Sequence, residues 1–310
     1  MDTEQSSPLA GIEQSSPLAG TGLRGLVGDR AAELGGRNRW HQLECDLTDA
    51  AAVDRAVAES PAEVVAHFAA FTDLNAAAAQ TGDRDGRCYR VNVDGTANLA
   101  AACRRHGRYL IHVSTDYVFS GDQEEPYRET DRPDPLDWYS RTKLWAEREV
   151  QESGCAFSVL RPSFPFRARY RRKEDLVRKL VGWLAAGRIP PMFEDTLVTP
   201  TFVDEFATAV ERVAQLRPPD GLFHCAGGSS LSPYDLTVTV ARTFGLDAAP
   251  AARGRLADYL RDAGRPYPRW LNVSNEHATR VLGVRFSRIE DALATMRDQL
   301  ALSGELPRTP

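Results

Sequence analysis

The chain has 310 residues, of which 42% are apolar and 26% charged, and a formal net charge of −5. This composition is typical of a globular enzyme, and the length suffices for one large α/β domain or for two unequal lobes. The acidic balance argues against a nucleic-acid-binding protein, and no apolar run approaches the ~18 residues that a membrane span needs.

The cysteines and the N-terminus indicate a cytoplasmic protein. The five cysteines are odd in number, widely spaced and without a C-x-x-C pair, which favours reduced thiols over a disulfide framework or a metal site. No signal peptide is visible. The sequence EQSSPLAG occurs at 4–11 and again at 13–20. Because this repeat is short, polar and rich in Ser and Pro, we predict that residues 1–15 form a disordered tail.

From residue 29 onward, amphipathic segments alternate with β-branched runs. Helices are predicted at 29–34, 49–58, 87–106 and 138–151, and strands at 40–44, 63–70, 109–115 and 156–161. Strands that alternate with helices of this length predict βαβ units and a doubly wound parallel sheet of the Rossmann-like type. The active site of such a sheet lies at the carboxyl ends of its strands.

The second half is less regular and predicts a smaller C-terminal substrate lobe. We expect helices at 173–186 and 203–216, an extended segment at 199–202 and a strand at 221–226. Ser232 before Pro233 predicts a helix start, and SRIE at 287–290 has capping-box spacing before a final helix. We assign residues 16–163 to an NAD(P)-binding domain and 164–310 to the substrate lobe, with about 199–227 returning to the main sheet.

A glycine-rich segment, TGLRGLVG, occupies 21–28. Gly22, Gly25 and Gly28 have the spacing of a turn that lets a pyrophosphate approach the backbone at a helix N-terminus. Only 17–19 precede Gly20 as a candidate first strand. In an alternative register, 23–29 is the second strand and the first βα unit is lost. We favour the glycine turn.

Two further motifs carry chemistry. Residues 139–143 read YSRTK on a predicted helix, so Tyr139 and Lys143 share one face, and we expect the ammonium to lower the pKa of the phenol. Thr115, in STDYVF, ends a predicted strand, where its hydroxyl could polarise a carbonyl group. Together they predict proton donation to a carbonyl oxygen.

These motifs, in this order, resemble the extended short-chain dehydrogenases, and in detail the dTDP-4-dehydrorhamnose reductase family. The resemblance is carried by TGLRGLVG, HFAAFTD (67–73), YRVNVDGTANL (89–99), IHVSTDYVF (111–119), PYRETDRPDPLDWYSRTK (126–143), VLRPS (159–163) and TPTFVDEFATA (199–209). It covers about residues 18–300. It implies reduction of a nucleotide-activated 4-keto-6-deoxy sugar by NADPH or NADH, without a metal, and a homodimer as one expected assembly.

The resemblance also implies residue roles. Thr115 would hold the keto oxygen, Tyr139 would donate its proton, and Lys143 would assist Tyr139 and bind the nicotinamide ribose. The other predicted cofactor-binding residues are the pyrophosphate-binding Gly22, Gly25 and Gly28; Asp46 and Leu47 near adenine; Phe68, Ala69 and Ala70 after a strand; Asn92 in the proton relay; and Arg161, Pro162 and Ser163 over the nicotinamide.

Some positions depart from the family pattern. The segment before Asp46 is short, so Glu44 is only a candidate for the acidic residue that selects NAD, and Arg24 is a candidate partner of a 2′-phosphate. Residues 164–166 (FPF) replace an aromatic pair, and the basic run at 167–173 suits either a nucleotide diphosphate or solvent. Two alternative functions remain: a sugar-nucleotide epimerase or dehydratase, and a non-catalytic dinucleotide-binding regulatory subunit.

Overall fold

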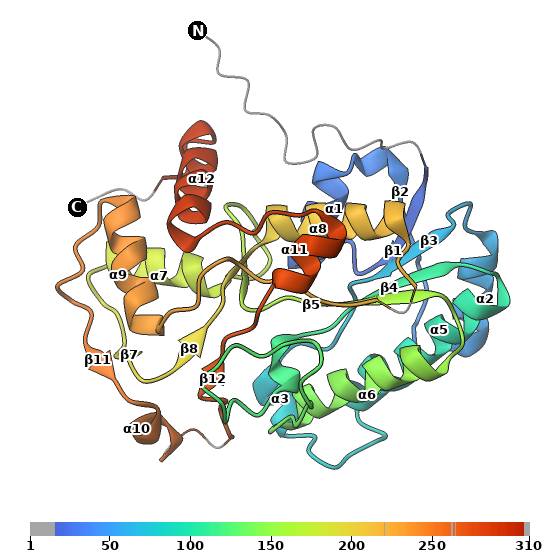
Figure 1. The fold of residues 1–310 in the computed structure, drawn as a ribbon, viewed down its shortest axis with the longest axis horizontal. Helices are drawn as coiled ribbons and strands as arrows, with labels where there is room; N and C mark the ends of the chain where they lie inside the picture. Colours follow the sequence, from blue (N-terminus) through green and yellow to red (C-terminus); the bar gives the residue numbers. More distant parts are fainter. Residues whose placement is uncertain (1–15, 220, 262, 264, 307–310) are drawn as a thin grey trace, which may run out of the picture.

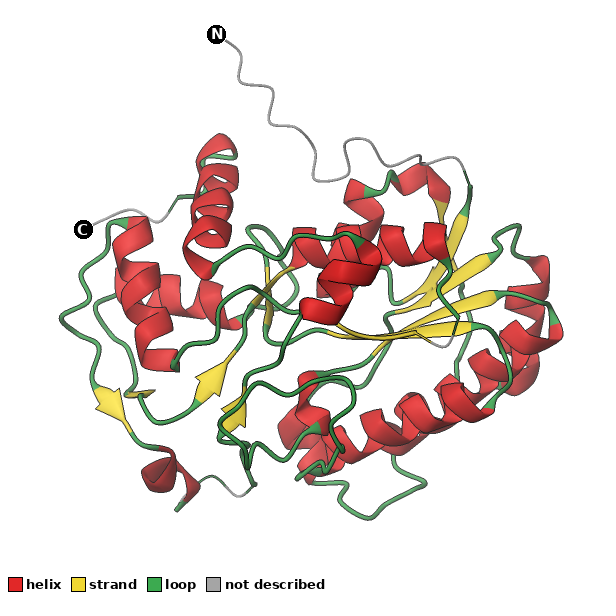
Figure 2. Ribbon diagram, in the orientation of Figure 1, coloured by secondary structure: helices red, strands yellow, loops and turns green. Residues whose placement is uncertain are grey.

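The computed structural model describes residues 16–219, 221–261, 263 and 265–306. The predicted tail, 1–15, lies outside the described residues. Figures 1 and 2 show a parallel sheet covered by helices on both faces, and a smaller group of helices and short strands beside it.

Six parallel strands form the main sheet in the order β10-β5-β4-β3-β1-β2. They are β1 (Leu18–Thr21), β2 (Trp40–Gln42), β3 (Val64–His67), β4 (Tyr109–Val113), β5 (Phe157–Arg161) and β10 (Gly221–His224). From β1 the chain passes to β2 on one side of β1, and it then crosses to β3 on the other side of β1. The predicted doubly wound α/β fold is confirmed, and its switch point lies between β1 and β3, where such sheets bind ligands.

Helices bury the sheet on both faces (Figure 1). On one face lie α1 (Leu26–Leu34), α8 (Val203–Leu216) and α11 (Glu276–Leu282), which share a core with β1, β3 and β4. On the other lie α2 (Ala50–Glu59), α5 (Gly95–Arg105) and α6 (Trp138–Glu152). Because helices cover both faces of the sheet, its strands are buried on both sides and read as continuous apolar runs in the sequence.

The smaller lobe has its own apolar core, built around three helices. These are α7 (Leu176–Ala185), α9 (Pro233–Phe244) and α12 (Ile289–Leu302). Three two-stranded pairs complete it: β6 (Pro165–Phe166) with β9 (Thr201–Phe202), β7 (Met192–Phe193) with β11 (Arg253–Gly254), and β8 (Leu197–Val198) with β12 (Trp270–Leu271). The short helix α10 is Leu256–Leu260. The predicted boundary at 163/164 stays a prediction. β10, within the segment expected to return at about 199–227, belongs to the main sheet.

Several helices of the described residues start at a side-chain cap. The side chain of Ser232 accepts a hydrogen bond from the backbone N–H of Asp235 and so starts α9 as predicted. The helix predicted from 173 begins three residues later, because Asp175 caps α7. The capping box predicted at 287–290 is wrong: Arg288 precedes the first turn of α12, which has no side-chain cap.

Within the described ranges, no helix is both long and apolar enough to cross a membrane. The same residues contain no group of three or more His, Cys, Asp and Glu side chains arranged to hold a metal ion.

Candidate active site at the carboxyl edge of the sheet

The glycine turn connects β1 to α1, so the predicted register is confirmed and the alternative with 23–29 as a strand is wrong. Gly22 has φ = +70°, a conformation that other residues rarely adopt. A Cβ at Gly22 would lie 2.6 Å from the backbone N of Ala69, which follows β3. Gly22 is therefore required by the close approach of the two loops at the switch point.

The start of α1 is open to a ligand. Gly25 precedes the first turn, and no side chain caps the helix, so the N–H groups of that turn point toward the edge of the sheet. A Cβ at Gly25 would meet only the carbonyl oxygen of Gly22, at 3.1 Å. By contrast, a Cβ at Gly28 would lie 2.6 Å from that same oxygen and 3.1 Å from the Phe68 ring. Gly28 thus serves packing, and Gly25 fits a nearby anion such as a pyrophosphate.

Asn92 holds the loop after β3 against the helix that carries Tyr139. Its amide donates to Thr142 Oγ1 at 2.9 Å and to the carbonyl oxygen of Phe71 at 3.2 Å, while its Oδ1 accepts from the N–H of Phe71 at 2.7 Å. Asn92 lies in a π-helical turn, Arg90–Asp94, between α4 (Arg87–Tyr89) and α5. Such turns frequently occur at functional sites. The side chain of Asn92 therefore positions this loop, whose residues Phe68, Ala69 and Ala70 are half-buried.

Asp46 and Leu47 form the turn after β2. Asp46 Oδ1 accepts from the N–H and hydroxyl of Thr48, which lowers the pKa of the carboxyl. The carbonyl oxygen of Leu47 accepts from the amide of Asn98 on α5. Both residues thus lie at the carboxyl end of β2, and their predicted contact with adenine stays a prediction.

Thr115 and Tyr139 are brought together by the end of β4 and the first turn of α6. Both are buried, with exposed fractions of 8% and 9%, and the Thr115 hydroxyl lies near enough to the phenol to lower its pKa against the effect of burial. Asp137 starts α6 by accepting from the N–H and hydroxyl of Ser140. The Thr115 hydroxyl, which donates to Asp116 Oδ1 at 3.1 Å, and the Tyr139 phenol therefore come from different elements to the same part of the carboxyl edge.

The expectation that Lys143 lowers the pKa of Tyr139 is wrong for this structure. Burial raises the pKa of Tyr139, and the nearby carboxylates of Asp116 and Asp137 raise it further. Burial also raises the pKa of Asp116 to about 7, against the hydrogen bond that the Thr115 hydroxyl donates to Asp116 Oδ1 at 3.1 Å. Tyr139 consequently keeps its proton at neutral pH.

Lys143 lies one helical turn beyond Tyr139 and is 2% exposed. Its ammonium donates to the carbonyl oxygen of Val113 on β4 at 2.8 Å and lies 3.5 Å from His112 Nε2. Burial lowers the pKa of Lys143 to about 8, opposed by the charge of Glu147. Lys143 therefore points at the strand behind the site.

Arg161 ends β5 with its guanidinium buried rather than in the cleft. It forms an ion pair with Glu147 on α6, at 2.6 Å. Pro162 and Ser163 connect this strand to the site: the carbonyl oxygen of Pro162 accepts from the N–H of Asp116 at 3.2 Å. The predicted nicotinamide contacts of these three residues stay predictions, and Arg161 has only its backbone left to contribute.

Sequence reasoning missed an aromatic wall opposite Thr115. Tyr117 packs on Phe164 and Tyr267, with ring centroids 5.8 and 6.3 Å apart. Phe164 has φ = +40°, a strained conformation that is common at functional sites. Arg265 Nη1 is buried, lies 3.9 Å from Asp137 Oδ2, and has no hydrogen-bond partner within the described part of the chain. The only sequence signal was FPF at 164–166, since Arg265 and Tyr267 lie far along the chain.

Comparison with known proteins finds relatives that are named reductases. The probable low-salt glycan biosynthesis reductase Agl14 of Haloferax volcanii is 33% identical over 261 residues, which are 83% of each chain. The dTDP-4-dehydrorhamnose reductase of Mycolicibacterium smegmatis is 29% identical over 94% of this chain and 88% of that one.

A solved structure shares the fold. The dTDP-4-dehydrorhamnose reductase of Bacillus anthracis, in complex with NADP, has a TM-score of 0.82 at 21% identity and covers 92% of this chain and 99% of that one. The family model described as RmlD substrate binding domain matches residues 18–302. The chain therefore belongs to the RmlD substrate binding domain family.

Proposed function

We propose that the chain reduces the keto group of a nucleotide-activated 4-keto-6-deoxy sugar, the reaction for which its reductase relatives are named. The observation that carries the proposal is that Thr115, just after β4, and Tyr139, in the first turn of α6, lie close together at the carboxyl edge of the sheet. Two hydrogen-bond donors aimed at one position can hold a carbonyl oxygen and stabilise the negative charge that develops on it.

The residues present fit a dinucleotide. The uncapped start of α1, with no side chain at Gly25, would hold its pyrophosphate, and the half-buried loop of Phe68, Ala69 and Ala70 would line it. Bound NADPH or NADH would supply the hydride. Lys143, with a pKa of about 8, is charged at neutral pH and is assigned to the nicotinamide ribose.

The electrostatics of the site support Tyr139 as the proton donor. Because burial raises the pKa of Tyr139, the phenol holds a proton to give to the forming alkoxide. Thr115 donates a second hydrogen bond to the same oxygen. Asp116, with a pKa of about 7, is partly protonated at neutral pH, which limits the negative charge beside that alkoxide.

The aromatic wall is assigned to the sugar. Tyr117, Phe164 and Tyr267 offer apolar faces, and the buried Trp138 Nε1 and Arg265 Nη1 have no hydrogen-bond partner among the described residues. Buried donors without partners are costly unless a ligand supplies acceptors. Sugar hydroxyls and phosphate oxygens are such acceptors.

The test is NADPH oxidation at 340 nm with dTDP-4-keto-6-deoxy sugars as substrates. Tyr139→Phe should lose about 10²–10⁴ in kcat, the usual share of general acid catalysis, and bind NADPH nearly as the wild type does. If a chain that binds NADPH turns over no nucleotide 4-keto sugar, the reductase proposal fails and the regulatory-subunit alternative replaces it.

We also infer a cytoplasmic location and a homodimer. All five cysteines are free thiols, as expected in a reducing compartment. Size-exclusion chromatography with light scattering tests the dimer.

A further inference from the structure

A short basic segment of the smaller lobe reaches across to the switch point of the main sheet. We call residues 169–173, between β6 and α7, the strap. The Tyr170 hydroxyl donates to the carbonyl oxygen of Arg24 at 2.6 Å, and Arg172 Nη1 donates to the same oxygen at 3.4 Å. Lys173 Nζ donates to Thr72 Oγ1 at 3.3 Å. Arg24 follows β1 and Thr72 follows β3, so the strap spans the two strands that flank the switch point.

Both ends of the strap are held by arginines. Before it, the buried Arg167 donates to Asp29 at 3.0 Å and to Glu33 at 2.8 Å, both on α1. After it, Arg178 on α7 pairs with Asp175 at 2.7 Å and donates to the carbonyl oxygens of Tyr170 and Lys173. The strap is therefore fixed at its ends, while all its side chains except that of Tyr170 are exposed.

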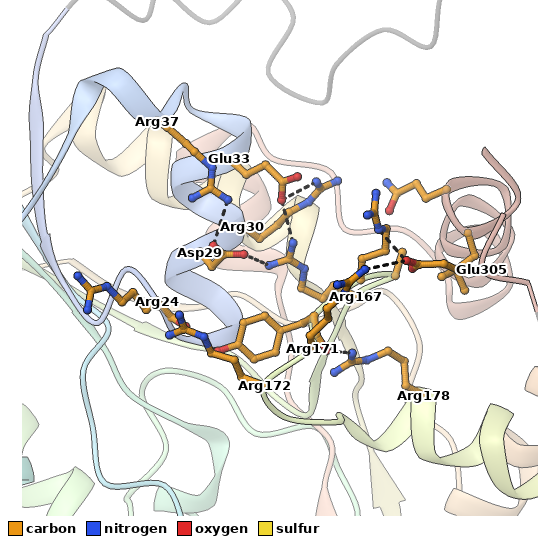
Figure 3. A pocket seen from close by; sticks show the side chains of 15 residues that line it. Arg24, Asp29, Arg30, Glu33, Arg37, Arg167, Arg171, Arg172, Arg178 and Glu305 are labelled. Carbon is orange, nitrogen blue, oxygen red and sulfur yellow. Dashed lines mark hydrogen bonds and ion pairs between the residues drawn. The ribbon is translucent and has the colours of Figure 1, made fainter. Parts of the chain in front are cut away.

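The surroundings of the strap are strongly positive, although the whole chain carries −5. A cavity of about 700 Å³ lies between α1, the strap and α12 (Figure 3). Its arginines outnumber its carboxylates, and each carboxylate is shared by two guanidinium groups. The arginines are Arg24, Arg30, Arg37, Arg167, Arg169, Arg171, Arg172 and Arg178, and the carboxylates are Asp29, Glu33 and Glu305.

The strap's cations fall into two pairs with different surroundings. Arg169 and Arg171 face Glu305 beyond α12, at 3.3 and 3.9 Å. Arg172 and Lys173 face the switch point, and within the described ranges their only acceptors are a carbonyl and a hydroxyl oxygen. Figure 3 shows Arg172 beside Arg24 at the end of the cavity nearest the start of α1. A cation next to neutral acceptors gains more from an anion than one already paired.

We propose that the strap closes over the pyrophosphate of a bound dinucleotide, with Arg172 and Lys173 donating to its oxygens. This rests on the proposed function, which places that pyrophosphate at the start of α1. The phosphate oxygens replace the Arg24 carbonyl and the Thr72 hydroxyl as acceptors, so the strap needs only side-chain rotation to engage them. The smaller lobe thereby contributes directly to cofactor binding.

The experiment compares two double variants that remove the same charge. Arg172→Ala/Lys173→Ala removes the pair at the switch point, and Arg169→Ala/Arg171→Ala removes the pair facing Glu305. Dissociation constants for NADPH and NADH are measured by nicotinamide fluorescence, and melting curves check that both variants fold. Trypsin digestion of the wild-type chain, with and without NADPH, reports on the strap itself, which holds four cleavable bonds.

The Arg172/Lys173 variant should weaken NADPH and NADH equally, by about ten- to hundredfold, while the control changes by less than about threefold. NADPH should also protect the strap from trypsin. Equal losses in both variants, or no loss, would overturn the proposal. A loss confined to NADPH would instead place these cations at the 2′-phosphate and overturn the pyrophosphate assignment. If the wild-type chain binds neither dinucleotide, the proposed function itself fails.

Discussion

Arg161 and Glu147 form a bidentate ion pair inside the protein. Arg161 Nε lies 2.8 Å from Glu147 Oε1, and Nη2 lies 2.6 Å from Oε2. Both side chains are almost completely buried, at 2% and 1% exposed, so water stabilises neither charge. The pair joins α6 to β5 and thus sets the position of Tyr139 and Lys143 against the sheet.

Glu147→Gln should destabilise the fold by about 3–5 kcal/mol, because it leaves a buried guanidinium without its counter-charge. Urea unfolding measures the change. Glu149→Gln, at an exposed position on the same helix, is the control. Glu147→Leu combined with Arg161→Met should recover most of the loss, since an apolar pair leaves no buried charge. An unchanged unfolding midpoint for Glu147→Gln would mean that the pair contributes nothing net.

The glycine turn offers a matched pair of variants. Gly22→Ala should cost about 1–3 kcal/mol or more, because alanine is strained at φ = +70° and its Cβ would meet Ala69. Gly25→Val should nearly keep the unfolding midpoint and abolish dinucleotide binding, since φ is −81° there and the added Cβ would meet one atom, the carbonyl oxygen of Gly22 at 3.1 Å. Urea unfolding and NADPH titration separate the two effects. NADPH affinity surviving in Gly25→Val would exclude this turn as the pyrophosphate site.

Local sequence patterns predicted most of the sheet and the placement of Tyr139 and Lys143. The alternation of apolar runs with amphipathic helices predicted a doubly wound parallel sheet, and Y-x-x-x-K placed Tyr139 and Lys143 on one face of α6. The glycine spacing identified the β1–α1 turn although β1 has only four residues. These patterns can be read from the sequence because each depends on residues that are close together along the chain.

Side-chain partners could not be read in the same way. Whether the Arg161 guanidinium enters the cleft or pairs with Glu147 depends on the packing of β5 against α6. The pKa of Tyr139 depends on burial and on Asp116, which no i,i+4 pattern reports. Arg265 and Tyr267 reach the site from the smaller lobe, more than a hundred residues away, and the strap's contacts with Arg24 and Thr72 are equally distant in sequence.

The raised pKa of Asp116 predicts that the stability of the folded protein depends on pH. Folding raises its pKa from 3.8 to about 7, so between these values the folded protein binds the proton more tightly than the unfolded chain. The stability from this group is therefore complete below pH 4 and lost as the pH rises to 7. Asp116→Asn should match the wild type near pH 4 and exceed it by at most about 4 kcal/mol at pH 8.

Urea unfolding at several pH values measures this difference, and contributions from other titrating groups cancel between variant and wild type. Asp134→Asn, at an exposed site, is the control. A stability difference that does not change between pH 4 and pH 8 would show that Asp116 titrates alike in both states.

The buried charge of Lys143 should lower the stability of the folded protein, although the same ammonium is assigned to the cofactor. Burial lowers its pKa from 10.5 to about 8, so the folded protein binds this proton less tightly than the unfolded chain does. At pH 7 the lysine is charged in both states, and its burial costs at most about 3 kcal/mol. The cost disappears as the pH rises from 8 through 10.5, where the unfolded chain also loses the proton. Lys143→Met should therefore be more stable than the wild type at pH 7, and this advantage should vanish near pH 11.

The same variant should lose turnover and NADPH affinity, because its ammonium is assigned to the nicotinamide ribose. Lys179→Met, exposed on α7, should change neither stability nor affinity. Urea unfolding at pH 7 and near pH 11, with NADPH titration at pH 7, gives all three readouts. If Lys143→Met is instead less stable at pH 7, the hydrogen bond to the Val113 carbonyl and the charge of Glu147 outweigh desolvation, and Lys143 is then a structural residue as much as a functional one. A buried lysine retained despite a net cost to stability is the outcome that a role at the cofactor requires.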